Sequence, residues 1–93
     1  MLDTLKANTA GEWSEGPNGI ICNRHEQDGG IIDRAILSKE WFIVFNRDGL
    51  DSLHGFPTRD SAIISFLNEI GKKIPVAIFA LVRGPGRAPD ARN

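Results

Sequence analysis

The sequence predicts a small α+β domain, an antiparallel sheet of four to five strands packed on one main helix. Turn-forming pairs interrupt the first half at short intervals, one segment at about 58–71 has helical spacing, and two segments, 41–45 and 76–82, are apolar at every position. A strand with one face in water alternates apolar and polar residues, so an unbroken apolar run is typical of a strand covered on both faces. Because one helix covers one face of a small sheet, the sequence predicts apolar sheet surface that something else must cover.

The first half reads as short strands separated by turns. Residues 1–12 form either a short helix, with Leu2 and Leu5 on one side, or a loose arm, because isolated helices of this length are marginal. Asn and Gly tolerate the positive φ angles of tight turns, and they mark three of them: Pro17–Gly19, Asp28–Gly30 and Arg47–Gly49. The expected strands are 12–14, 20–25, 31–37 and 40–46, with a short break at Ser38-Lys39 and a long loop from Arg47 to Pro57.

The helix is the clearest element. Thr58 is a suitable N-cap and Asp60 lies in the first turn, where the helix dipole favours a negative charge. Apolar residues follow the i, i+3, i+4, i+7 spacing of one buried face: Ile63, Phe66, Leu67 and Ile70. Gly71 is expected to end it. A final strand is expected at 74–82, with a short helix from Pro75 as the alternative, so that residues 1–83 form one domain and 84–93 a disordered tail.

Composition places the chain among ordinary globular proteins. It has 93 residues, of which 41% are hydrophobic and 25% charged, with a formal net charge of −1. Up to Val82 there are eight Lys and Arg against eleven Asp and Glu, whereas nucleic-acid binding usually needs a basic surface. The single cysteine excludes an intramolecular disulfide. Without a signal-peptide pattern or an apolar run of about 20 residues, a cytoplasmic location without membrane contact is expected.

No pattern in the chain indicates catalysis, a cofactor or a metal. Cys22 and His25 suggest a thiol and a base, but positions three apart in a strand point to opposite faces, unless the strand bends or His54 arrives from the long loop. Cys22 is therefore expected to be a small buried thiol beside a surface histidine. These three side chains also lack the paired spacing and fourth ligand of structural zinc.

The candidate functional residues are those of an interface. Tryptophan is enriched at interface hot spots, and Trp41 shares one face of its strand with Ile43 and Phe45, while Phe42 and Val44 take the other. The loop 47–56 is longer than usual. Its apolar residues are expected to pack as a lid over the core, and the functional alternative places Leu53 and His54 at a binding edge.

We therefore expect a small non-catalytic interaction module that binds another protein or a second copy of itself. Proteins of this kind often act as inhibitors, immunity proteins or accessory factors, including those of phages and mobile elements. The surface expected to carry the contact is made of Trp41, Ile43, Phe45, Leu53 and His54.

The alternative is a small nucleic-acid-binding domain. Three strands followed by a helix, with Gly55–Asp60 leading into that helix, resemble in outline the small DNA-binding sheets at the N-terminus of integrases, over residues 31–70. That resemblance implies basic contacts on the sheet, which would be Arg24, Arg34, Lys39 and Arg47. The acidic balance up to Val82 argues against this alternative.

Overall fold

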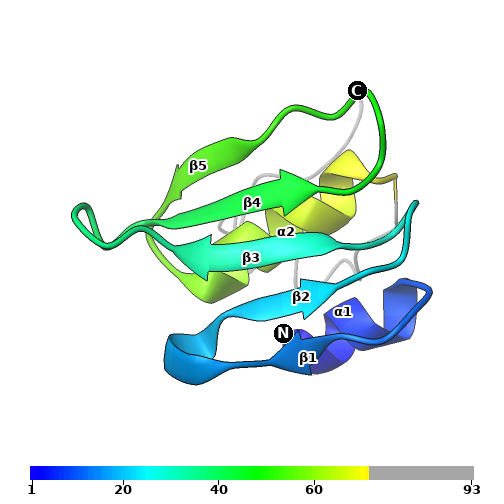
Figure 1. Cartoon of the computed structure of the whole chain (residues 1–93), viewed down its shortest axis with the longest axis horizontal. Helices are drawn as coiled ribbons and strands as arrows, with labels where there is room; N and C mark the ends of the chain where they lie inside the picture. Colours follow the sequence, from blue (N-terminus) through cyan, green and yellow to red (C-terminus); the bar gives the residue numbers. More distant parts are fainter. Residues whose placement is uncertain (72–93) are drawn as a thin grey trace, which may run out of the picture.

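A computed structural model of the chain describes residues 1–71. Two helices lie on the same side of a five-stranded sheet (Figure 1). In chain order the elements are α1 (Leu2–Asn8), β1 (Ser14–Glu15), a 3-10 turn (Pro17–Gly19), β2 (Ile21–Asn23), β3 (Gly30–Arg34), β4 (Trp41–Phe45), β5 (Leu53–Phe56) and α2 (Arg59–Glu69). The predicted α+β class is confirmed. The expected strand 74–82 and the tail 84–93 lie outside the described residues.

The sheet is an antiparallel meander in the order β1-β2-β3-β4-β5. Consecutive strands pair because each connection is short, and the first of them shows why the turn residues are needed. Asn18 and Gly19 have φ angles of 60° and 82°, a region that few other residues enter without strain. The predicted turn at Pro17–Gly19 is confirmed, and it joins β1 to β2.

The helix α2 begins as the sequence indicates. The Thr58 side chain accepts a hydrogen bond from the Ser61 backbone N–H, and the Ser61 hydroxyl oxygen accepts one from the Thr58 backbone N–H. This reciprocal cap satisfies two N–H groups that the first turn leaves without helical partners. The helix ends at Glu69, and Gly71 follows with a φ of 80°, the left-handed conformation expected after a helix.

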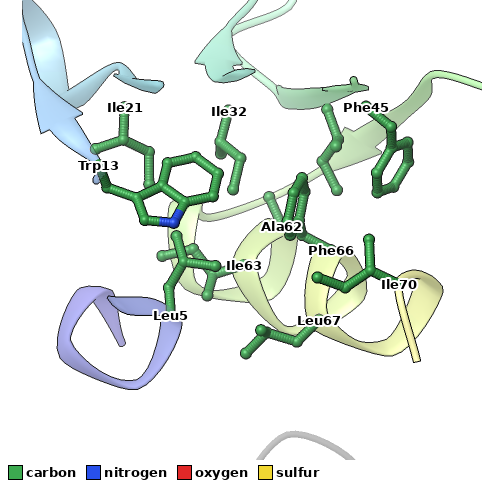
Figure 2. Packing of buried hydrophobic residues seen from close by; sticks show 11 residues of the cluster. Leu5, Trp13, Ile21, Ile32, Phe45, Ala62, Ile63, Phe66, Leu67 and Ile70 are labelled. Atoms are coloured by element: carbon green, nitrogen blue, oxygen red, sulfur yellow. The ribbon is translucent and has the colours of Figure 1, made fainter. Parts of the chain in front are cut away.

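The core lies between α2 and one face of the sheet (Figure 2). Phe66 is its centre and is fully buried. Its ring stacks on Phe45 at a centroid distance of 5.0 Å and lies nearly perpendicular to the Trp13 ring at a centroid distance of 5.3 Å. Ile21 and Ile32 contribute from β2 and β3. The alternation of the strands therefore sends every second side chain towards the helix.

The N-terminal segment is a helix, and it does not cover the second face of the sheet. Leu5 is fully buried, and α1 packs beside α2 on the same side (Figures 1 and 2). Of the two alternatives for residues 1–12, the short helix is therefore present. Neither α1 nor α2, the two helices of residues 1–71, is long and apolar enough to cross a membrane.

The loop expected from Arg47 to Pro57 is wrong in its second half, where residues Leu53–Phe56 form β5. Leu53 pairs with Ile43 and Phe56 with Trp41. Leu53 and Phe56 are three positions apart on β5, whereas their partners Ile43 and Trp41 are only two apart on β4. The extra residue is Gly55, which has a φ of 91°, as in a glycine β-bulge. The bulge lets Leu53 and Phe56 both pack against the core, which an unbroken strand would not allow.

Candidate interaction surface

The side of the sheet turned away from α2, which we call the far face, carries apolar and polar side chains together. Strand alternation places there the residues between the core positions, and the strand register arranges them in two rows. One row is Ser14, Cys22, Ile31 and Val44, and the other is Asp33, Phe42 and His54. Ile31 and Val44 are neighbours across β3 and β4, with exposed fractions of 38% and 37%.

The connection between β3 and β4 is a protruding hairpin (Figure 1). Its base is closed by the Ala35 N–H, which donates to the Glu40 carbonyl at 2.7 Å, and its turn by the Lys39 N–H, which donates to Ala35 at 3.0 Å. Ile36 is 83% and Leu37 is 95% exposed. We call these two residues the hairpin tip. Because backbone hydrogen bonds hold the loop, its shape does not depend on contacts of these two side chains.

A hollow of about 310 Å³ lies beside the hairpin on the far face. It is lined by Ala35, Ser38 and Glu40 of the hairpin, by Phe42 and Val44 of β4, and by the segment 52–55. Its floor is therefore the apolar part of β4, and its rim is polar. Such an arrangement, an apolar centre inside a polar rim, is typical of surfaces that bind an apolar side chain. We call it the far-face hollow.

The residues expected at the interface lie on both faces of the sheet. Ile43 is fully buried and Phe45 is 8% exposed, and both lie in the core on the α2 side. Trp41 and Leu53 are half-buried and pack against the same core. Only His54 is exposed, on the far face at the end strand β5. The prediction chose the β4 residues that face α2, whereas the β4 residues on the far face are Phe42 and Val44.

The basic residues of the nucleic-acid alternative are not gathered on one surface. Arg34 and Lys39 lie at the hairpin, where the Arg34 Nε donates to the Lys39 carbonyl at 3.1 Å. Arg24 lies at the opposite end of the sheet, because Asn23 pairs with Gly30 at the start of β3.

Arg47 has a structural role. Its guanidinium donates to the carbonyls of Gln27 and Ile70 at 3.0 and 3.3 Å and contacts the Asp28 carboxylate at 3.3 Å. Arg47 therefore ties the loop before β3 to the end of α2, and its charge is directed into this junction.

The expected buried thiol is wrong, because Cys22 is exposed. Its position on the far face, opposite to the core residue Ile21, explains the exposure, and its Sγ lies 3.4 Å from the Ser14 hydroxyl. The Nδ1 of His25 is occupied by local contacts, because it accepts hydrogen bonds from the backbone N–H groups of Gln27 and Asp28 at 3.2 and 3.1 Å. Within residues 1–71, no three His, Cys, Asp or Glu side chains gather where they could hold a metal ion.

Sequence reasoning missed the hairpin tip, because it extended the strand at 31–37 through Ile36 and Leu37. The paired strands stop earlier, at Arg34 and Trp41, and leave these side chains in the connection. The one local signal was the short length of the Ser38-Lys39 break, which would have required a two-residue turn without Gly or Asn.

Comparison with family models, with curated proteins and with solved structures finds no match to this chain.

Proposed function

We propose that this protein is a small non-catalytic protein-interaction module that binds a polypeptide through its far face and hairpin tip. The observation that carries the proposal is the exposure of four large aliphatic side chains: Ile31 and Val44, which pair across β3 and β4 on the far face, and Ile36 and Leu37 in the hairpin that joins these strands. Burying one such side chain fully contributes about 1.5–3 kcal/mol. A surface of this kind favours association with another apolar surface.

The hairpin tip supports this proposal more strongly than the sheet does. A turn closed by its own backbone hydrogen bonds would be equally well formed with polar side chains, which water would solvate better. Ile36 and Leu37 therefore contribute little to the fold of the described residues, and their chemistry suits contact with a partner. The proposed role is binding because aliphatic side chains supply binding energy and carry no acid–base or nucleophilic chemistry.

The test compares the native chain with a variant of the far face. Val44→Lys places a charge on the far face beside Ile31, and Asn68→Lys places the same charge on the exposed side of α2 as a control. The native chain and both variants are immobilised and offered a tagged second copy of the chain and an extract of the source cells, and bound polypeptides are quantified.

We expect a polypeptide, either the second copy or a foreign one, that the native chain and Asn68→Lys retain and that Val44→Lys loses. Circular dichroism of each variant checks that the fold is intact. Retention of the same polypeptides by a folded Val44→Lys variant, or no specific binding by the native chain, would refute the proposed function.

A further inference from the structure

We propose that the polypeptide bound by the far face is a second copy of this chain. Two copies associate about a two-fold axis, with Ile36 and Leu37 of each copy in the far-face hollow of the other. This inference rests on the proposed function and names its partner and its contact residues.

The hairpin tip and the far-face hollow are a protrusion and a recess that lie next to each other. Ala35 and Ser38, which flank the hairpin tip, line the far-face hollow together with Phe42 and Val44. Ile36 borders a second hollow that also includes the far-face residue Asp33. The tip therefore lies between two residues that line the far-face hollow, Ala35 and Ser38. A two-fold interface requires a surface that is complementary to itself, and an adjacent apolar knob and apolar hollow meet that requirement.

The far-face hollow and the hairpin tip also match in size. The far-face hollow has a volume of about 310 Å³. Removing one large aliphatic side chain from a protein core leaves a cavity of about 150 Å³, so the hollow has room for about two such side chains. Ile36 and Leu37 are two adjacent side chains of that kind, and they are the most exposed large apolar residues of the described chain.

The charged residues around the hairpin tip are balanced in sign. The hairpin and its base carry two basic residues, Arg34 and Lys39, and two acidic ones, Asp33 and Glu40. Such a mixed rim can meet itself across a two-fold axis without net charge repulsion, and it offers both signs of charge for pairing between copies. A lipid surface would instead favour apolar residues surrounded by an excess of Lys and Arg. The balanced rim fits a second copy better than a membrane.

The first experiment measures the mass of the full-length protein by sedimentation over a range of concentrations. We expect the native chain to dimerise at micromolar concentration. Leu37→Asp is expected to raise the dimer dissociation constant by about a hundredfold, because each dimer contains the altered site twice. Gln27→Glu, which adds the same charge to an exposed loop at the other end of the sheet, is the control and should leave dimerisation unchanged.

The second experiment locates the contact by cross-linking two different chains. Both carry Cys22→Ser, one carries Leu37→Cys, and the other carries His54→Cys, so that a disulfide between the two new positions forms only between copies. Mild oxidation of the mixture is expected to give the mixed covalent dimer. Ser52→Cys, also in the far-face hollow, is a second acceptor position, and Asn68→Cys on α2 is the control that should not react.

Each outcome separates this inference from the proposed function. A dimer that keeps its affinity in Leu37→Asp, or that gives no mixed disulfide at position 52 or 54, overturns the contact while self-association stands. A monomer that binds a foreign polypeptide through Val44 overturns the inference and leaves the proposed function intact. A monomer without any such partner refutes both.

Discussion

Replacing Gly30 by alanine tests the packing of the sheet on α2 at one methyl group. Gly30 begins β3, where it pairs with Asn23 on one side and Phe45 on the other. A Cβ at this position would overlap the Val44 backbone oxygen and would lie 3.0 Å from Cε2 of Phe66 and 3.3 Å from Cα of Phe45. Two of these three neighbours are backbone atoms of β4, so no side-chain rotation can make room.

The loss of stability in Gly30→Ala has three contributions. Forcing an extra methyl group into a packed core costs about 1–3 kcal/mol. Displacing the Val44 carbonyl from the ladder weakens a hydrogen bond worth about 1 kcal/mol. The lower chain entropy of unfolded alanine offsets about 0.5–1 kcal/mol. We therefore expect Gly30→Ala to lower the free energy of unfolding by about 2 kcal/mol, which for a domain of this size lowers Tm by about 8–16 °C.

The assay is urea unfolding at a fixed protein concentration, followed by the fluorescence of the buried Trp13 and the half-buried Trp41. Gly49→Ala is the matched control, because Gly49 has a φ of 89° and no atom within 4 Å of an added Cβ. Its cost is a left-handed backbone strain of about 1–2 kcal/mol less the same entropy offset of about 0.5–1 kcal/mol, which leaves about 1 kcal/mol. Equal destabilisation by the two substitutions would show that the close approach at Gly30 does not determine stability, and the reasoning would fail.

Three further substitutions test other contacts by the same unfolding assay. Thr58→Ala removes the acceptor for the Ser61 N–H and should cost about 1 kcal/mol; an unchanged midpoint would show that the cap contributes nothing. Arg47→Ala removes the guanidinium from the Asp28 carboxylate and two carbonyls and should cost about 2 kcal/mol, whereas a loss below 0.5 kcal/mol, roughly that of an exposed pair, would contradict its structural role. Trp41→Ala removes a half-buried ring packed on the core and should cost about 2 kcal/mol; a stable variant that fails to dimerise would instead place Trp41 at an interface.

Local chemistry was enough to predict most elements of the described fold. The cap at Thr58 and the spacing from Ile63 to Ile70 depend on neighbours within a few positions of the chain, and so does the turn at Asn18 and Gly19. The alternation of β4 also follows from the sequence, because period two is a property of any strand. What the alternation did not reveal was which of its two rows faces α2.

That choice depended on contacts between segments far apart in the chain. The row with Ile43 and Phe45 turns towards α2 because Phe66 stacks on Phe45 there, which leaves Val44 on the far face. An unbroken apolar strand satisfies either orientation locally, so only packing against the helix distinguishes the two.

The sequence by itself therefore determined the class of fold, the helix α2 and its cap, and the presence of more apolar surface than one helix covers. Only the tertiary structure decided that residues 53–56 are a strand and that Ile36 and Leu37 form a hairpin tip. In both places the sequence does not alternate, and strand pairing settles the register through the bulge at Gly55 and the early end of β3 at Arg34. Register is set by the partner strand and the core beneath it, neither of which a local pattern contains.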